Sequence, residues 1–170
     1  IEGANPRYLP RAKVYAGACS LGPAVLSPAP DEPLEIRMGI LVAGGAEHGE
    51  VAVWIERYDL RRDRWRLVRS MPIALNHPAA AAYRGDLYVL GGYTGRSDLS
   101  GPSRALLRYD PERDRWSRLP SMPTARAALA VGVGGGRLYA AGGANGVEAL
   151  ATLEIYDFAR RRWSRGPDMG

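Results

Sequence analysis

Seven residues with side chains suited to ligand binding fall in predicted loops of this 170-residue chain: His48, Asn76, His77, Tyr93, Arg96, Arg126 and Asn145. A guanidinium group forms paired hydrogen bonds with a carboxylate, so Arg96 and Arg126 could clamp an acidic ligand. The competing interpretation is structural, with each arginine bonded to carbonyl groups of neighbouring loops. Because loop residues on a rigid scaffold often bind ligands, we predict that these seven are ligand-binding residues.

The spacing of reactive residues does not indicate catalysis or metal binding. Cys19 is the single cysteine, which excludes an internal disulfide. The only histidines, His48 and His77, are too few for a zinc site with finger-like spacing. Neither a Ser/His/Asp arrangement nor a motif of paired carboxylates is indicated. We therefore predict no catalytic residue, no metal and no cofactor.

Two short motifs resemble binding sequences but fall in predicted turns. Residues 131–136 are rich in glycine, as phosphate-binding loops are, yet the predicted strand 137–141 follows where such a loop needs a helix. Residues 84–86 spell the adhesion tripeptide Arg-Gly-Asp at the equivalent position of the preceding repeat. We predict a hairpin turn in both places.

A pattern that occurs three times must position these loops. A glycine pair begins at residues 44, 91 and 142, a Tyr-Asp pair at 58, 109 and 156, and a tryptophan lies at 65, 116 and 163. Met-Pro follows at residues 71 and 122, and Met169 lies at the matching place in the third copy. A repeat of about 50 residues, composed of strand and turn residues, is typical of a propeller or solenoid.

Each copy predicts four short strands and no helix. Short apolar runs before the glycine pairs are typical of buried strands, and the glycines suit positive φ or a close backbone approach. The strand with the Tyr-Asp pair ends in a hairpin, where the aspartate side chain can cap the turn. The tryptophan then opens an outer strand whose flanking arginines discourage pairing with another chain.

The predicted organisation is a single domain. Residues 1–37 are irregular, with a first strand at 10–17 and four prolines within 22–33. We expect the proline-rich part to be a long insertion in the first repeat; a disordered leader is the alternative. Three repeat units follow, over residues 38–72, 73–123 and 124–170.

Net charge is +5, and Lys13 is the only lysine among 23 basic residues. Many arginines cluster in three predicted turns, and acidic residues interrupt two of these clusters. We therefore expect a solvated role for them and no nucleic-acid partner. No segment has the length of a membrane span, so we expect no membrane partner.

The order Gly-Gly, Tyr-Asp, Trp and Met-Pro resembles the kelch repeat over residues 38–170 and, less closely, over 10–38. The resemblance implies an all-β fold, a β-propeller of four-stranded antiparallel blades packed face to face. The repeated Tyr and Trp would fill the gaps between blades and bond a turn backbone with their polar tips. Three blades cannot close a ring, so we expect a partial ring, or half of a six-bladed ring completed by a homodimer.

The resemblance also implies recognition through loops on one propeller face. Arg126 matches the position where the oxidative-stress sensor of this family has a peptide-binding arginine, although the previous repeat has Leu75, Asn76 and His77 there. We predict a binding or scaffold module for a protein or small acidic ligand.

One alternative is a carbohydrate-active enzyme resembling the sialic acid mutarotase of this family. Its candidate site residues would come from loops and include Glu47, His48, Asn76, His77 and Arg126. A copper site like that of galactose oxidase is not expected, because the chain lacks the ligands. A purely structural domain is the third interpretation.

Overall fold

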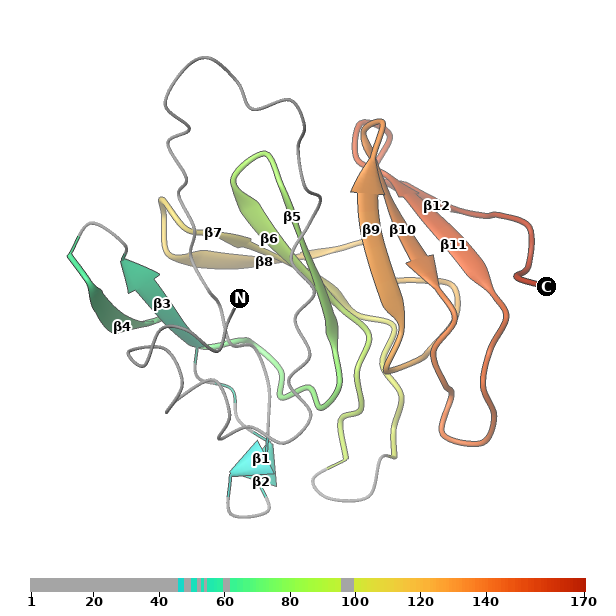
Figure 1. Ribbon diagram of the computed structural model, residues 1–170, viewed down its shortest axis with the longest axis horizontal. Helices are drawn as coiled ribbons and strands as arrows, with labels where there is room; N and C mark the ends of the chain where they lie inside the picture. The colour runs from blue at the N-terminus through green and yellow to red at the C-terminus, as the bar shows by residue number, and fades with distance from the viewer. Residues whose placement is uncertain (1–45, 48–49, 52, 54, 60–61, 96–99) are drawn as a thin grey trace, which may run out of the picture.

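The computed structural model describes residues 46–47, 50–51, 53, 55–59, 62–95 and 100–170. These residues form strands, turns and loops without any helix (Figure 1). The part of the chain that is described therefore contains no helix able to span a membrane. The predicted strand at 10–17, the proline-rich stretch 22–33, and Gly44–Gly45 lie outside these residues.

Two complete four-stranded antiparallel sheets confirm the blade architecture. Blade 2 consists of β5 (Ala79–Tyr83), β6 (Asp86–Leu90), β7 (Leu106–Asp110) and β8 (Arg115–Leu119), in that spatial order. Blade 3 repeats the arrangement with β9 (Ala130–Gly134), β10 (Arg137–Ala141), β11 (Leu153–Asp157) and β12 (Arg162–Arg165). The hairpin turns at 84–85 and 135–136 join the first two strands of each blade, as predicted, whereas residues 131–134 of the glycine-rich motif belong to β9 and Asp86 begins β6.

Blade 1 is represented by its outer hairpin, β3 (Ile55–Asp59) and β4 (Arg64–Val68). A two-residue pair, β1 (Ala46–Glu47) and β2 (Glu50–Val51), precedes it. The Tyr-Asp strand of this blade is β3. Its pairing with β4 has the same Tyr-opposite-Trp register as the other two blades.

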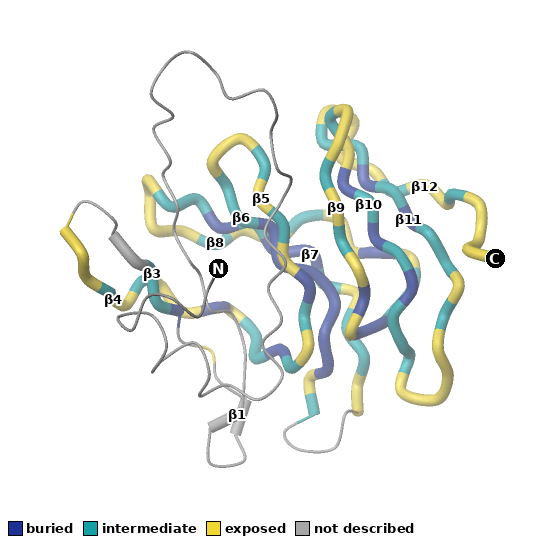
Figure 2. The backbone as a smooth tube through the Cα atoms, viewed as in Figure 1, coloured by how far each residue is buried: buried dark blue, intermediate teal, exposed yellow. Residues whose placement is uncertain are grey.

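The blades pack face to face, with β5 of blade 2 next to β9 of blade 3 (Figure 1). Buried residues line the space between the sheets (Figure 2). The cluster between blades 2 and 3 includes Tyr88, Leu90, Leu106, Leu138 and Tyr156. A second cluster joins the β3–β4 hairpin to blade 2 and includes Ile55, Leu75, Val89 and Leu107. Burial of these apolar side chains is the main driving force that holds the blades together.

Trp116 and Trp163 connect neighbouring units, as the sequence predicted for the repeated tryptophans. Trp116 Nε1 donates to the carbonyl oxygen of Arg69 at 2.8 Å, and Trp163 Nε1 donates to that of Pro120 at 2.7 Å. Their rings also pack against the repeated tyrosines, with centroids 5.0 Å apart for Tyr109–Trp116. Each indole therefore fills apolar space and satisfies a backbone carbonyl of the preceding linker.

Aspartate side chains cap the outer hairpins. Asp110 Oδ1 accepts hydrogen bonds from the backbone N–H groups of Glu112 and Arg113, at 3.0 and 3.1 Å. In blade 3, Asp157 Oδ1 accepts from Arg160 N at 2.8 Å. Hydrogen bonds hold the pKa of each carboxyl below its ordinary value. For Asp110 the leading cause is the hydrogen bond from the Arg113 side chain, and for Asp157 it is the hydrogen bond from the Arg160 backbone N–H.

The glycine pairs after β6 and β10 have the backbone conformation that the sequence predicted. Gly91 and Gly143 have φ values of 67° and 90°. A Cβ atom on either would lie 2.5 Å from a carbonyl oxygen, that of Arg126 for Gly91 and that of Ala127 for Gly143. Only glycine fits both requirements, and the pairs let each blade approach the linker that follows or precedes it.

Candidate functional site

Two loops emerge on one face of the blades, and we call this the loop face. Residues 91–105 connect β6 to β7, and residues 142–152 connect β10 to β11 (Figure 1). Each loop begins as a narrow ribbon that extends its blade: Tyr93 bridges to Asn76 and Pro102, and Ala144 bridges to Ala127 and Ala149. The loops are therefore fixed at their bases by backbone hydrogen bonds.

Tyr93 lies where the linker into blade 2 meets the first loop. Asn76 N donates to Tyr93 O at 2.8 Å, and Tyr93 N donates to Asn76 O at 2.7 Å. The His77 ring is exposed and meets the Tyr93 ring edge-on, with centroids 6.5 Å apart. The structure thus brings three of the predicted site residues together around a side chain that is 5% exposed.

The second loop ends in a turn that Asn145 caps. Its Oδ1 accepts hydrogen bonds from the backbone N–H groups of Val147 and Glu148, both at 2.9 Å. Asn145 N donates to Glu148 O at 3.2 Å, and Gly146 supplies the positive φ of 91°. This turn fixes its backbone while Val147 remains 93% exposed. Asn145 therefore shapes the loop, and its side-chain oxygen already has two donors.

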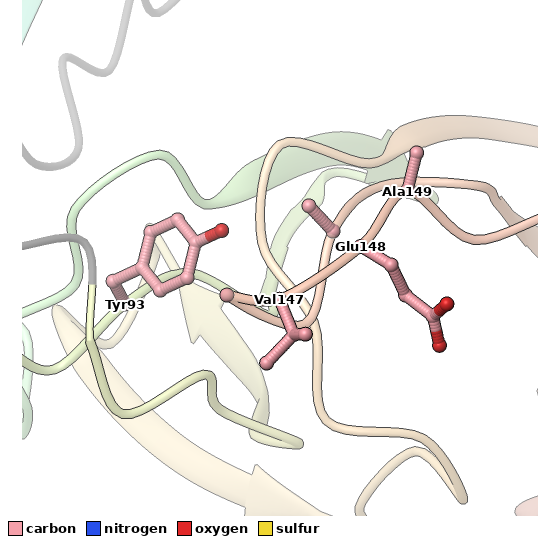
Figure 3. A pocket seen from close by; sticks show the side chains of 6 residues that line it. Tyr93, Val147, Glu148 and Ala149 are labelled. Carbon is pink, nitrogen blue, oxygen red and sulfur yellow. The ribbon is translucent and has the colours of Figure 1, made fainter.

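A groove of about 300 Å³ lies between the two loops. Its lining consists of Tyr93, Ala144, Gly146, Val147, Glu148 and Ala149. Figure 3 shows the Tyr93 hydroxyl directed toward the second loop, which bears Val147 and Glu148, and the Glu148 carboxylate directed away from Tyr93. The groove therefore combines an apolar wall with a single acidic end. A volume at this scale suits one or two side chains of a ligand.

Glu148 supplies the only charge among the lining residues that the structure describes. The described lining thus contains one carboxylate and no histidine or arginine. Over the described ranges, no three His, Cys, Asp or Glu residues are grouped as metal ligands.

Arg126 lies in the interior, not on the loop face. It is fully buried, and its Nη2 lies 2.8 Å from Glu154 Oε2. The two terminal nitrogens also donate to the carbonyl oxygens of Ala140, Gly142 and Thr152 at 2.8–3.1 Å. Burial lowers the Arg126 pKa, and the Glu154 carboxylate opposes that shift. This geometry matches the structural interpretation of Arg126, because its terminal nitrogens have partners inside blade 3.

Of the seven predicted site residues, four lie together on the loop face, in two neighbouring loops and the linker beside them: Asn76, His77, Tyr93 and Asn145. Arg96 and His48 lie outside the described residues. Sequence reasoning did not select Val147 and Glu148, although Asn145-Gly146 marks a tight turn. That dipeptide was the available signal that the next two side chains lie at a loop tip.

Comparison with known proteins agrees with this architecture. The family model described as the Kelch motif matches residues 74–123 and 125–170. Human Kelch-like protein 34 is 37% identical over 128 residues, covering 74% of this chain and 20% of that protein. Kelch repeat and BTB domain-containing protein 1 of cowpox virus (strain Brighton Red) is 28% identical over 160 residues, covering 94% and 26%. The chain thus spans about a fifth to a quarter of these relatives.

Among solved structures, that of YjhT matches with a TM-score of 0.67 at 17% identity, over 75% of this chain and 48% of that one. This likeness concerns the fold alone. The two matched segments cover blades 2 and 3 and the linkers that lead into them. The chain therefore belongs to the kelch-repeat family.

Proposed function

We propose that this chain is a recognition module whose protein partner docks on the loop face. The observation that carries the proposal is Val147, an apolar side chain that is 93% exposed on a turn fixed by Asn145. A turn whose backbone is already fixed loses little conformational entropy when a partner covers it. Kelch-repeat relatives named for an additional BTB domain are consistent with a scaffold role.

The acidic ligand expected from the arginines is not part of the proposal. Arg126 is buried against Glu154, and the described groove lining is acidic. No described residue of this lining is an arginine. The lining therefore offers no guanidinium group to bind a carboxylate of the partner.

Photo-crosslinking tests the proposal directly. A benzoylphenylalanine at position 147 is expected to crosslink a protein of the source cell, and excess wild-type chain should compete with that product. Val147→Asp should lose the ability to compete. Leu67→Asp provides a matched control, because Leu67 is 70% exposed on β4, away from the loop face. Equal competition by both variants would contradict recognition through this face.

We also propose that a second copy covers the outer face of blade 3. Tyr88, Leu90 and Leu106 of blade 2 are at most 6% exposed, because blade 3 covers them. The corresponding residues of blade 3, Tyr139, Ala141 and Leu153, are only partly buried. An apolar sheet face of this kind favours a further blade as its neighbour.

The mass of the particle in solution tests this pairing. Sedimentation equilibrium of the wild-type chain should give twice the chain mass, and Leu153→Glu should give the single-chain mass with an unchanged circular dichroism spectrum. A wild-type particle of single-chain mass at high protein concentration would refute the pairing, without bearing on the loop face.

A further inference from the structure

The groove on the loop face joins apolar surface to one negative charge. Val147 supplies the exposed apolar surface beside the nearly buried Tyr93 ring, and the neighbouring Glu148 carboxylate is directed away from Tyr93 (Figure 3). Glu148 forms no ion pair with any described residue, whereas Asp86, Asp110, Asp157 and Asp168 each pair with an arginine. The charge at the groove is therefore available to a ligand.

The turn fixes the backbone at Glu148 and at its apolar neighbour. Glu148 N and Val147 N both donate to Asn145 Oδ1, so the two backbone positions are set by one capping oxygen. A ligand that covers Val147 consequently lies next to Glu148. The recognition element is thus a pair of adjacent residues, one apolar and one anionic.

The charge of the groove is opposite to that of the whole chain, which is +5. An acidic partner would experience long-range attraction to the chain but local repulsion from Glu148, whereas a basic side chain gains a local partner here. Arginine suits the site better than lysine, because its guanidinium binds a carboxylate through two parallel hydrogen bonds. Its methylene stem can cover Val147 while the head reaches Glu148.

We propose that the groove binds an arginine of the partner protein, with a neighbouring apolar residue of that protein beside Val147. This inference rests on the proposed function of the loop face and adds the chemical class of the ligand. It also reverses the sign of the ligand that the sequence predicted.

Selection from a random dodecapeptide display library tests the assignment. The wild-type chain is the bait, and the library is first cleared on the Val147→Ser/Glu148→Gln double variant. Enriched peptides are synthesised with a fluorescent label, and their affinities are measured by anisotropy. We expect an arginine next to an apolar residue in the enriched sequences.

The variants then separate charge from shape. Glu148→Gln should weaken binding about tenfold, the scale of one charge-assisted hydrogen-bonded pair. Replacement of the peptide arginine by lysine should weaken binding to the wild-type chain less than Glu148→Gln does. A peptide with glutamate in place of this arginine should bind Glu148→Arg better than it binds the wild-type chain. Glu112→Gln provides a matched control at an exposed glutamate in the β7–β8 turn, and should leave affinity unchanged.

The outcomes distinguish this inference from the proposed function. If the enriched peptides are neutral or acidic and bind Val147→Ser more weakly than the wild-type chain, the arginine assignment is overturned. Recognition by the loop face would then still stand. Arginine peptides that bind Glu148→Gln as well as wild type would also overturn it. If no peptide is enriched, or none responds to substitution of Val147, both proposals fail.

Discussion

The guanidinium of Arg126 lies 2.8 Å from the Glu154 carboxylate, and both side chains are almost completely buried. At the equivalent positions of the preceding repeat the chain has Leu75 and Leu107, which belong to one buried apolar cluster. The same place between successive blades is thus occupied by an ion pair in one repeat and by two leucines in the other. The two residue types change together because a single buried charge without its partner is strongly unfavourable.

This relationship predicts a non-additive pair of substitutions. Arg126→Leu or Glu154→Leu alone should destabilise the fold by about 3–5 kcal/mol, because each leaves an uncompensated buried charge. The double variant should cost less than either single change, although the carbonyls of Ala140, Gly142 and Thr152 lose a donor. Urea unfolding of all four proteins measures the coupling. Costs that simply add would show that the two groups do not act as a pair.

The glycine that follows β10 predicts a second stability effect. Gly143→Ala places a Cβ 2.5 Å from Ala127 O at a φ of 90°, so the linker into blade 3 must move. We expect a loss of at least about 2 kcal/mol from backbone strain together with the displaced contact. Gly132→Ala is the matched control, because a Cβ there meets nothing within 4 Å. It should be neutral or stabilise slightly, and similar thermal unfolding midpoints for the two variants would contradict the argument.

Much of this fold could be predicted from the sequence because it depends on local patterns. Asp110 and Asp157 cap hairpins that are four residues long, and the glycine pairs occur at fixed distances from the strands. The tryptophan role followed from the repeat itself, since an aromatic residue at every copy of one position must fill equivalent space. Such features need information from only one repeat.

The candidate groove was predicted less well because it depends on two loops that are about 50 residues apart in the sequence. Tyr93 was selected, but its neighbour across the groove is set by how blade 2 packs on blade 3. The role of Arg126 depended on side-chain direction, because a residue next to a loop can point outward or into the blade. Comparison of Arg126 and Glu154 with Leu75 and Leu107 would have indicated the buried pair from sequence.

A carboxylate in the β7–β8 turn predicts acid sensitivity. Asp114 Oδ1 accepts hydrogen bonds from the Tyr109 hydroxyl at 2.6 Å and from Arg69 N at 2.8 Å. Both hydrogen bonds lower the pKa of the Asp114 carboxyl. The bond from Tyr109 has the larger effect and the bond from Arg69 the smaller. Because the folded-state pKa is below the unfolded value of about 3.9, the carboxylate stabilises the fold above that pH. Its contribution is lost as the pH falls through the folded-state pKa.

Asp114→Asn removes this titration while keeping an acceptor oxygen for both donors. Asparagine also tolerates the positive φ of 48° at this position. The free energy of unfolding should therefore fall less steeply below about pH 4 in the variant than in the wild-type chain. Urea titrations between pH 3 and pH 6 measure the difference, and parallel pH profiles would show that Asp114 contributes nothing to the acid limb.

The Asn145 cap predicts that order in one turn controls binding at the loop face. Asn145→Ala removes the oxygen that accepts from Val147 N and Glu148 N, so both amides should exchange with solvent faster. Asn145→Asp keeps an acceptor at the same place and should protect them. Because the turn is exposed and lies outside both buried clusters, global stability should change by only about 1 kcal/mol. Affinity for peptides selected on the wild-type chain should fall in Asn145→Ala and survive in Asn145→Asp. Equal exchange rates and affinities in the two variants would mean that the turn is held by something other than its cap.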